Sequence, residues 1–520
     1  MRRRPLLVVA ATLAALTAGL LPQLAPTASA ATTLTNTGFE SGVGQAPTGW
    51  SEYSAGGHQA ASFSQAGGHS GNNRLSHWST GAYQVETYQY LSGIANGTYT
   101  LWAWVRSSGA QNAYLSLRNC GGAEARTMLP WSATWQQISV TTRVTSGQCT
   151  ISLVSNGRAN DWADFDDIRL ASTGSTGSTI RIRGADISSL KKSEDRGGVY
   201  RDSGGTQRDA VTLLRSNGVN YGRLKVWVNP ADGYNNRARV LTMARRIKSA
   251  GMQLLVDFHY SDSWADPGQQ DKPRAWAGYS VSQLSSAVYN HTYDVLNALK
   301  AQGTTADMVQ VGNEINDGML WPEGRSSNWA NLATFLKSGV SAVKAVNGST
   351  RVMLHLAEGG NNTQHRWWFD QAVSRGVPFD VIGVSHYIYW HGTVASLQAN
   401  LIDLALRYGR DVVVAETAYG FTTAQDDGEP NIFTAALART GGFPATAQGQ
   451  ADALRAVYNA VRAVPNNRGL GVFYWEAPWT AVPGNGWDPT RPASGNGWEN
   501  QALFGYDDRA LPGLAVLGSA

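Results

Sequence analysis

The sequence predicts two folds in one chain, an all-β sandwich followed by an α/β domain of the (β/α)8 or TIM barrel type. Three observations support this. Beyond residue 180, eight strand-like runs alternate with segments of helical spacing. Between residues 31 and 172, short runs rich in β-branched and aromatic residues are separated by Gly, Asn and Ser. A chain of 520 residues also exceeds the size at which one hydrophobic core keeps growing, so at least two domains are expected.

Residues 1–30 have the composition of a secretory signal peptide. Three arginines (2–4) precede an apolar segment (6–21), and the tripeptide Ala-Ser-Ala at 28–30 matches an A-x-A cleavage site. A membrane anchor is the alternative. However, Pro22 and Pro26 follow the apolar segment, and no later apolar stretch approaches about 20 residues. We therefore expect a secreted, extracellular protein that does not associate with membranes.

Residues 31–172 are expected to form the sandwich. The runs 98–105, 113–117, 135–140 and 149–154 have the length and composition of strands, and no helical period lies between them. Two packed antiparallel sheets are the expected arrangement. A Gly/Ser/Thr linker at residues 173–179 then separates this region from the barrel domain, residues 180–520.

The chain has two cysteines, Cys120 and Cys149, and both lie in the sandwich region. In an exported protein two such cysteines are expected to pair. A disulfide closing this loop would stabilise the domain by roughly 3 to 4 kcal/mol on the chain-entropy model. Two free thiols are the alternative, and a metal site is less favoured because neither cysteine has a Cys or His neighbour nearby in sequence.

The barrel prediction depends on how regularly strands and helices alternate. Helical spacing is clearest at 281–300, 329–346, 394–408 and 448–464. The eight strand-like runs end at Asp186, Trp227, His259, Glu314, His355, Tyr387, Thr417 and Glu476.

Two of these strand ends bear the carboxylates that suggest the chemistry. Glu314 closes the run Val-Gly-Asn-Glu, and Glu416 lies at the end of Val-Val-Val-Ala-Glu-Thr. The carboxyl ends of barrel strands form the active-site face, so both side chains are expected in one pocket. Paired carboxylates facing one cavity are what glycoside hydrolysis requires.

The composition agrees with a glycan ligand. The net charge of +4 is small for this length, which argues against nucleic acid as a partner. The chain contains 19 Trp and 20 Tyr but only 15% charged residues. Aromatic rings stack on the C–H faces of sugars, and neutral polar groups match their hydroxyls.

Eight segments of the barrel domain form a specific pattern. They are 184–190 (GADISSL), 222–227 (GRLKVW), 257–267 (DFHYSDSWADP), 310–314 (QVGNE), 390–393 (WHGT), 415–417 (AET), 471–476 (GVFYWE) and 500–504 (NQALF). On these segments, residues 180–520 resemble glycoside hydrolase family 53, the arabinogalactan endo-β-1,4-galactanases, which are retaining enzymes of clan A. His386 and Ile388 depart from the family pattern, which has Tyr and Pro there.

The resemblance implies a role for each matching residue. Glu314 is implied to be the general acid/base and Glu416 the nucleophile of a double displacement. Asn313 is expected to bind the sugar 2-OH, and Arg223 and Tyr387 to hold Glu416 ionised and oriented. The substrate-binding residues expected in full are Arg223, Trp227, His259, Trp264, Asn313, His355, Tyr387, Trp390, His391 and Trp475.

A second resemblance depends on segments 36–42, 75–79, 103–109 and 162–168 of the sandwich region. On these segments, the region resembles the galactan-binding carbohydrate-binding modules of family 61. Trp78, Tyr83 and Arg106 are the expected sugar contacts, although a Trp in a sandwich is more often a core residue. A structural calcium is also expected there, bound by Glu40 with Asp166 or Asp167, unless these acids only cap turns.

The resemblance also suggests a calcium site in the loop after the seventh strand, formed by Asp427, Glu429 and Asn431. No cofactor is expected for the chemistry itself. The predicted substrate is β-1,4-galactan or type I arabinogalactan in pectin side chains, and the predicted state is a monomer. Two alternatives remain, a retaining endo-β-glycanase of the same clan that acts on another plant polysaccharide and a non-catalytic glycan-binding protein.

Overall fold

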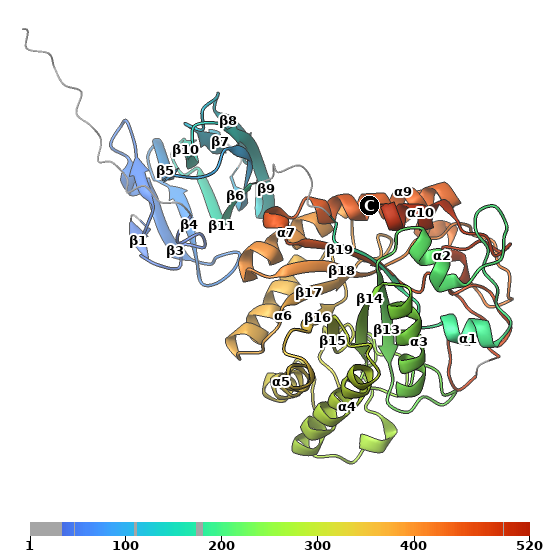
Figure 1. Ribbon diagram of the computed structural model, residues 1–520. Coiled ribbons are helices and arrows are strands. Elements are labelled where there is room, and N and C mark those ends of the chain that lie inside the picture. The colour runs from blue at the N-terminus through green and yellow to red at the C-terminus, as the bar shows by residue number, and fades with distance from the viewer. Residues whose placement is uncertain (1–33, 46, 109–111, 173–179, 492, 520) are drawn as a thin grey trace, which may run out of the picture. The chain divides into compact units, whose positions relative to one another are not determined.

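The computed structural model describes residues 34–45, 47–108, 112–172, 180–491 and 493–519 (Figure 1). The predicted signal peptide and linker, residues 1–30 and 173–179, lie outside them. The chain divides into two compact units, Met1–Ala171 and Ser172–Ala520. Among the described helices, none is long and apolar enough to cross a membrane.

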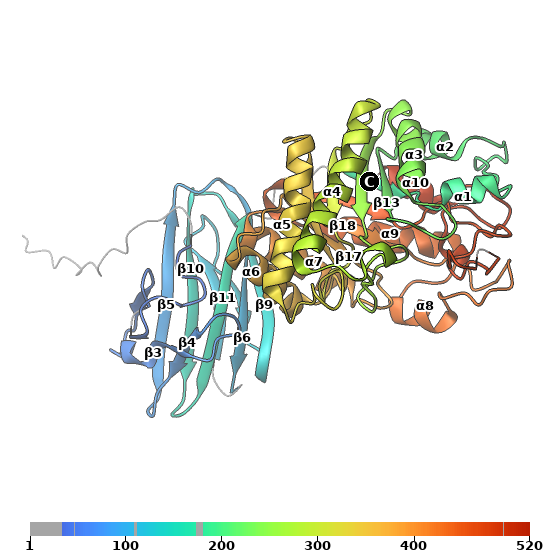
Figure 2. The same ribbon diagram turned by 90° about the horizontal axis from the view of Figure 1, so that it is seen from below.

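The first unit is the predicted sandwich of two antiparallel sheets, whose long strands are seen side by side in Figure 2. One sheet has the order β1 (Gly44–Gln45), β3 (Ser62–Ala66), β4 (Asn73–Trp78), β11 (Trp162–Ser172), β6 (Gly97–Ser107) and β9 (Ser132–Val144). The other has the order β2 (Ser51–Tyr53), β5 (Tyr83–Ser92), β10 (Gln148–Gly157), β7 (Asn112–Arg118) and β8 (Ala125–Met128).

The sandwich core forms because alternate side chains of each strand point between the sheets. On β6, for example, Leu101, Ala103 and Val105 are fully buried, whereas Trp102 and Trp104 on the other face are partly exposed. The predicted disulfide between Cys120 and Cys149 is present in this core, where it links the end of β7 to β10.

The second unit is the predicted barrel of eight parallel strands, which pair in sequence order until the last meets the first. The first four strands are β12 (Ile182–Asp186), β13 (Tyr221–Val226), β14 (Gln253–Phe258) and β15 (Met308–Val311). The other four are β16 (Arg351–Leu356), β17 (Val381–Ser385), β18 (Asp411–Thr417) and β19 (Gly469–Tyr474). Each of the eight predicted runs contains or overlaps one of these strands, so the strand prediction is confirmed.

Helices surround the strands on the outside of the barrel (Figure 1). The four helices predicted by their spacing are α4 (Val281–Ala301), α5 (Trp329–Val346), α7 (Val394–Tyr408) and α9 (Ala447–Arg462). The others are α1 (Leu190–Asp195), α2 (Ala210–Ser216), α3 (Arg237–Ser249), α6 (Asn362–Ser374), α8 (Ala435–Gly441) and α10 (Pro512–Ser519).

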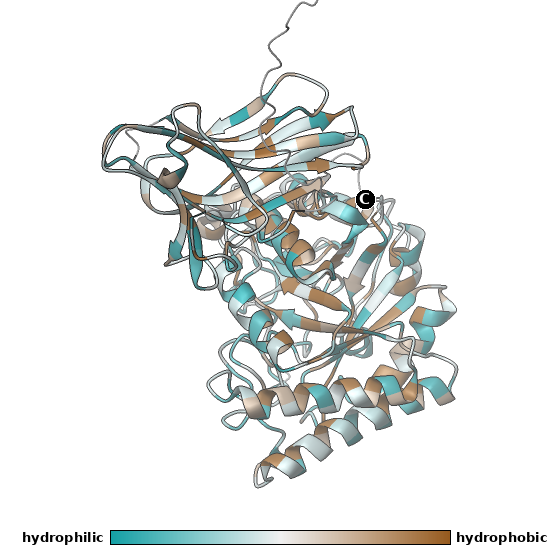
Figure 3. Cartoon of the chain, turned by 90° about the vertical axis from the view of Figure 1, so that its left-hand side faces the viewer, coloured by the Kyte–Doolittle hydropathy of each residue, from teal (hydrophilic) through white to brown (hydrophobic). Residues whose placement is uncertain are grey.

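Local sequence sets where these helices begin and which face they bury. Ser280 and Gln283 form a reciprocal capping box at the start of α4, and the Thr393 hydroxyl caps α7. The helices show both apolar and polar colours in Figure 3, because one face packs on the strands and the other is in water. The strands are almost entirely buried, as expected when both faces of a parallel sheet are covered.

Candidate active site

The backbone turns sharply where β15 ends, and this turn presents Glu314. Gly312 and Glu314 both have positive φ, +86° and +48°. A Cβ at Gly312 would lie only 2.7 Å from the Ile315 side chain, so this position requires glycine. Glu314 itself is in a conformation that L-residues adopt at a cost of about 1 to 3 kcal/mol. Such strain is typical of catalytic residues.

Glu416 lies inside β18 and is held from two sides. The Tyr387 hydroxyl donates a hydrogen bond to Glu416 Oε2 at 2.9 Å, and Arg223 Nη2 lies 2.8 Å from Oε1. All three side chains are buried. These contacts fix the carboxylate in one orientation and favour its ionised form.

Arg223, on β13, is the centre of the buried polar network. Its guanidinium donates to Asp186 Oδ2 at 2.8 Å and to Asp257 Oδ2 at 2.9 Å, in addition to its pairing with Glu416. It also donates to Gln310 Oε1 at 3.2 Å and Asn313 Oδ1 at 2.9 Å. Arg223 is 1% exposed, so these interactions are formed away from water.

Lys225 and Glu476 form another buried ion pair in addition to those of Arg223. Lys225 Nζ is 2.5 Å from Glu476 Oε1, and the other oxygen of Glu476 accepts hydrogen bonds from Ser189. The two cations Arg223 and Lys225 therefore lie among five buried carboxyl groups, those of Asp186, Asp257, Glu314, Glu416 and Glu476.

Because the buried carboxyl groups outnumber the two cations, the two candidate catalytic residues differ in how strongly they hold a proton. Burial, reinforced by the nearby Glu416 charge, raises the pKa of Glu314 well above its usual value. Burial also raises the pKa of Glu416, but Arg223 and the Tyr387 hydrogen bond oppose the shift. When the pair carries one proton, that proton therefore belongs on Glu314, which makes Glu314 a candidate acid and Glu416 a candidate nucleophile.

Both carboxyl groups open into one cleft of about 440 Å³. Six of the predicted substrate-binding residues line it together with Glu314 and Glu416: His259, Trp264, Asn313, Tyr387, Trp390 and Trp475. The fold therefore places the two predicted catalytic residues and six of the ten predicted substrate-binding residues in one cleft.

The other four predicted substrate-binding residues lie outside this lining. Arg223 and His355 are buried in the network behind the cleft. His391 lies beside Tyr387 and Ser385, where its Nδ1 is 3.1 Å from the Ser385 carbonyl oxygen. Trp227 is 2% exposed, packs edge-on against Trp264 and donates to His259 Nδ1. The prediction that Trp227 is a substrate-binding residue is therefore wrong, because Trp264 covers it.

The cleft also contains aromatic residues that the sequence reasoning missed. Trp479, Trp487 and Trp498 all come from the long segment between β19 and α10. Trp264 donates its indole N–H to the Trp487 carbonyl oxygen at 2.7 Å, and its ring stacks at 5.9 Å on Trp479. The recurrence of Trp at 475, 479, 487 and 498 was the available sequence signal.

The predicted calcium loop after β18 is held by hydrogen bonds within the protein. Asp427 accepts from the backbone N–H groups of Glu429 and Asn496, and Asn431 donates to the Ala424 carbonyl oxygen. Glu429 lies at the cleft wall. Across the described residues, no three or more His, Cys, Asp or Glu side chains are grouped to hold a metal. Calcium in this loop stays a prediction.

The suspected calcium ligands of the sandwich are similarly bonded to the chain. Glu40 accepts from the backbone N–H groups of Asn72 and Asn73, and Asp166 from those of His69 and Ser70. The Ser70 hydroxyl donates to Asp167. Burial and the neighbouring Asp167 raise the pKa of Asp166 to about 8. This calcium site also stays a prediction.

The predicted sugar contacts of the sandwich have different environments. Trp78 is 40% exposed and pairs across the sheet with Trp162. Arg106 bonds Asp164 at 2.8 Å and lies over the Trp135 ring. Tyr83, by contrast, is 2% exposed and donates its hydroxyl to the His77 carbonyl oxygen. The prediction for Tyr83 is therefore wrong, because it points into the core of the sandwich.

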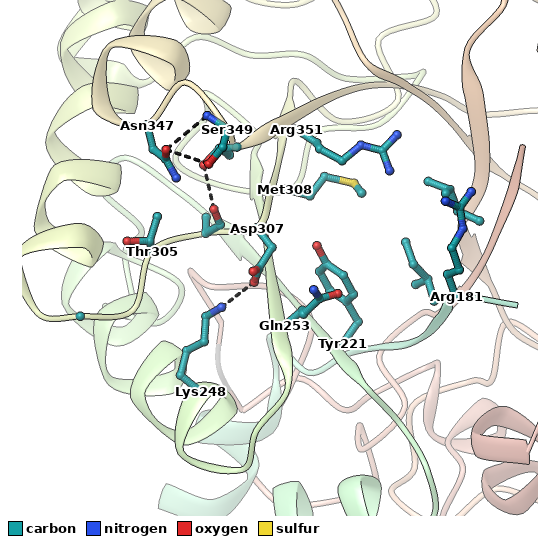
Figure 4. A pocket seen from close by; sticks show the side chains of 15 residues that line it. Arg181, Tyr221, Lys248, Gln253, Thr305, Asp307, Met308, Asn347, Ser349 and Arg351 are labelled. Carbon is teal, nitrogen blue, oxygen red and sulfur yellow. Dashed lines mark hydrogen bonds and ion pairs between the residues drawn. The ribbon is translucent and has the colours of Figure 1, made fainter.

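A larger cavity, of about 570 Å³, lies at the opposite end of the barrel (Figure 4). Its lining includes the first residues of several strands, such as Tyr221, Gln253, Met308 and Arg351. The Lys248–Asp307 ion pair forms part of its wall. None of the predicted catalytic or substrate-binding residues is among its lining residues.

Comparison with known proteins agrees with this geometry. The model of glycosyl hydrolase family 53 matches residues 182–517. The "Uncharacterized protein in bgaB 5'region" of Niallia circulans is 41% identical over 65% of this chain and 93% of that protein. The arabinogalactan endo-beta-1,4-galactanase of Thermothelomyces thermophilus is 35% identical over 65% of this chain and 98% of that enzyme.

Two solved structures are similar to parts of the chain. The Ignisphaera aggregans GH53 catalytic domain is 42% identical, covers 66% of this chain and 97% of that one, and has a TM-score of 0.63. A module titled as a complex with beta-1,4-galactotriose is 22% identical over 28% of this chain and 99% of that one, with a TM-score of 0.24. Similarity at that level assigns no ligand to the sandwich.

Proposed function

The chain belongs to glycosyl hydrolase family 53, and from this premise we propose that it is a secreted endo-β-1,4-galactanase that cuts galactan side chains of pectin with retention of anomeric configuration. The supporting observation is the pair of buried carboxyl groups in one cleft, Glu314 and Glu416, with Arg223 holding the second. The relatives named as arabinogalactan endo-β-1,4-galactanases support the substrate.

The geometry supports a double displacement with distinct roles for the two residues. Glu416, held by Arg223 and Tyr387, attacks the anomeric carbon and forms a glycosyl-enzyme. Glu314 donates its proton to the leaving oxygen. Its raised pKa keeps that proton available near neutral pH. Glu314 then removes a proton from the water that hydrolyses the intermediate.

The walls of the cleft suit a chain of neutral sugars. Trp264, Trp475, Trp479 and Trp487 line it together with Trp390 and Trp498. Indole faces stack on the apolar faces of galactosyl units, and the neutral polar groups Asn313 and Gln269 are available to the hydroxyls. Binding to several sugar units in succession favours cleavage within the polysaccharide.

Substrate choice is tested by measuring reducing-sugar release from β-1,4-galactan, mannan and xylan. We expect release from galactan and a mixture of oligosaccharides rather than galactose alone. Release from mannan or xylan without release from galactan would overturn the substrate assignment. No release from any of the three would favour a glycan-binding protein that has kept the fold.

The mechanism and the two roles need a separate measurement. Proton NMR of the first product formed from a β-galactoside should show the β-anomer before mutarotation, and an initial α-anomer would refute retention. Azide should restore turnover of an activated substrate by Glu416→Ala and give an α-galactosyl azide. Glu314→Ala with azide should give the β-azide, because the nucleophile remains.

Secretion and galactan binding by the sandwich are tested on the full chain. N-terminal sequencing of the exported protein should begin at Ala31, after the predicted cleavage site. For the sandwich, Trp78→Ala should weaken retention on insoluble galactan, because this ring is 40% exposed. Tyr83→Phe is the matched control, since Tyr83 is buried.

A further inference from the structure

Gln310, on β15, is a fully buried residue of the polar network to which neither the cleft nor the ion pairs give a role. Its Oε1 is 3.2 Å from Arg223 Nη2, and its Nε2 is 2.8 Å from both Asn313 Oδ1 and His355 Nδ1. A guanidinium can only donate, so the atom that faces Arg223 must be the amide oxygen. The NH2 group of Gln310 therefore faces Asn313, to whose Oδ1 it donates.

The amide of Asn313 is held in one orientation by contacts at both of its ends. Its Oδ1 accepts from Arg223 Nη2 at 2.9 Å and from Gln310 Nε2 at 2.8 Å. Its Nδ2 donates to the Ala265 carbonyl oxygen at 2.8 Å. Since a carbonyl oxygen only accepts, the two ends agree on which atom is nitrogen and which is oxygen. A reversed amide would place NH2 against two donors.

Of the two donors to Asn313 Oδ1, Gln310 is the less divided. Arg223 Nη2 carries two hydrogens but has four acceptors within 3.2 Å, the oxygens of Asp257, Gln310, Asn313 and Glu416. Gln310 Nε2 has two hydrogens and two neighbours, so one hydrogen serves Asn313 alone. Arg223 by itself would therefore hold the Asn313 oxygen only weakly.

This orientation leaves one N–H of Asn313 for a ligand. Nδ2 carries two hydrogens, and within the described part of the chain only Ala265 accepts one of them. Asn313 lines the cleft together with Glu314 and Glu416. The matching group on a bound sugar is a hydroxyl oxygen close to the anomeric carbon, which is the 2-OH.

We propose that Gln310 is a positioning residue that holds the Asn313 amide with its remaining N–H toward the bound sugar, and that it thereby sets how strongly the enzyme depends on the 2-OH of its substrate. Hydrogen bonds to the 2-OH strengthen as the transition state forms. A less firmly held amide therefore lowers kcat more than it raises KM. This inference rests on the proposed hydrolysis of β-1,4-galactan and adds a residue outside the cleft to it.

The test compares two nitrophenyl β-galactobiosides, of which one lacks the 2-OH on the sugar that bears the nitrophenyl group. The measured quantity is the ratio of kcat/KM for the intact substrate to kcat/KM for the deoxy substrate. In Gln310→Met this ratio should fall by about three- to tenfold from the wild-type value, the effect of weakening one neutral hydrogen bond. The different intrinsic reactivity of the two substrates cancels when enzymes are compared.

Two further variants separate positioning from a general loss of packing. Gln450 is also fully buried, and its Nε2 donates to the carbonyl oxygens of Tyr419 and Ala502, both at 2.9 Å. Gln450→Met should lower the free energy of unfolding but keep the wild-type ratio. Asn313→Ala should give the lowest ratio, and Gln310→Met/Asn313→Ala should lower it no further. A Gln310→Met enzyme that is slower on both substrates by the same factor would overturn the proposal.

The orientation can also be tested without any substrate. The side-chain NH2 signal of Asn313, identified by its loss in Asn313→Ala, should show 15N relaxation of a rigid group in the wild type and of a more mobile one in Gln310→Met. Equal rigidity in the two proteins would overturn the proposal. A wild-type enzyme that is inactive on galactan and on the intact galactobioside would instead refute the proposed function, and the NH2 signal would still test the positioning.

Discussion

The two ends of the barrel differ in the burial and pairing of their charged side chains. At the amino end, Lys248 pairs with Asp307 and Arg351 with Asp411, at 2.5 and 2.7 Å, and these side chains are 21% to 34% exposed. At the carboxyl end, Arg223 and Lys225 share five buried carboxyl groups, and both cations are at most 3% exposed. The amino end has the larger cavity, but the carboxyl end has the two acids, Glu314 and Glu416, whose pKa values burial raises.

This difference shows what marks a reactive site. Surface ion pairs cost little to form because both partners stay partly hydrated, whatever the size of the cavity beside them. Buried acids in excess over cations repel one another, so a proton is retained on the acid with the least support. Here that acid is Glu314. The barrel can tolerate this because its hydrophobic layers and helices stabilise the fold independently.

Removing Arg223 should have the largest effect on this contrast. Arg223→Met leaves Asp186, Asp257 and Glu416 buried without their cation, so the free energy of unfolding should fall by about 3 to 5 kcal/mol. Activity on galactan should be abolished. Urea unfolding followed by tryptophan fluorescence measures the first effect.

Arg351→Met is the matched control for Arg223→Met at the amino end. Its partner Asp411 keeps Arg181 and Arg468 nearby, at 3.8 and 3.7 Å, so the loss should stay within about 1 kcal/mol. Equal destabilisation by the two variants would contradict the distinction between the two ends.

Removing Lys225 should have the next largest effect. Lys225→Met leaves Glu476 without its ion partner, which should cost about 3 kcal/mol of unfolding free energy. Lys225 Nζ also lies 4.0 Å from the centre of the Trp264 ring. Without this cation–π contact, the Trp264 ring should be held less firmly in the cleft wall, so KM for galactan should rise. Steady-state kinetics separates the two effects. An unchanged KM would show that the ring contacts of Trp264 and its hydrogen bond to Trp487 hold it in place without Lys225.

The sequence predicted the barrel and its carboxylate pair because both follow from periodicity. A buried parallel strand is a continuous apolar run, and the polar residue that ends it is visible at once, as in the runs before Glu314 and Glu416. The same reasoning wrongly predicted that Trp227 binds substrate. It follows β13 in sequence, but only the fold shows that Trp264 lies over it.

The residues that were missed or misassigned have other causes. Trp479, Trp487 and Trp498 belong to an irregular segment, where no period predicts which side chains face the cleft. Gln310 and Ser385 both contact His355 from strands that lie far apart in the sequence, and no local pattern predicts such contacts. Tyr83 could have been assigned to the core, because it shares a strand face with the buried Val85 and Leu91.

A smaller effect is expected when one hydrogen bond to the nucleophile is removed. The Tyr387 hydroxyl donates to Glu416 Oε2, and this hydrogen bond lowers the pKa of the carboxyl group. Tyr387→Phe removes the hydrogen bond. The pKa of Glu416 should therefore rise, and the acidic limb of kcat/KM should move to higher pH by about one unit. The pH profile of the variant, compared with that of Tyr389→Phe, checks this. A limb that moves to lower pH would contradict the assignment of Glu416 as the nucleophile.

The smallest effect on stability and activity is expected from a substitution at the amino end of the barrel. This substitution is the most direct test of the difference between the two ends. Lys248→Met removes the partner of Asp307, but Asp307 is 31% exposed and also accepts the Leu254 backbone N–H at 2.7 Å. Water can therefore solvate the carboxylate, and the free energy of unfolding should change by less than about 1 kcal/mol. Added salt should reduce this loss further, whereas the loss from Lys225→Met should not respond to salt, because buried pairs are poorly screened. Kinetics on galactan should equal those of the wild type. A loss above about 2 kcal/mol, or a fall in kcat/KM, would mean that the amino-end cavity is coupled to the catalytic end and that the two ends are not independent.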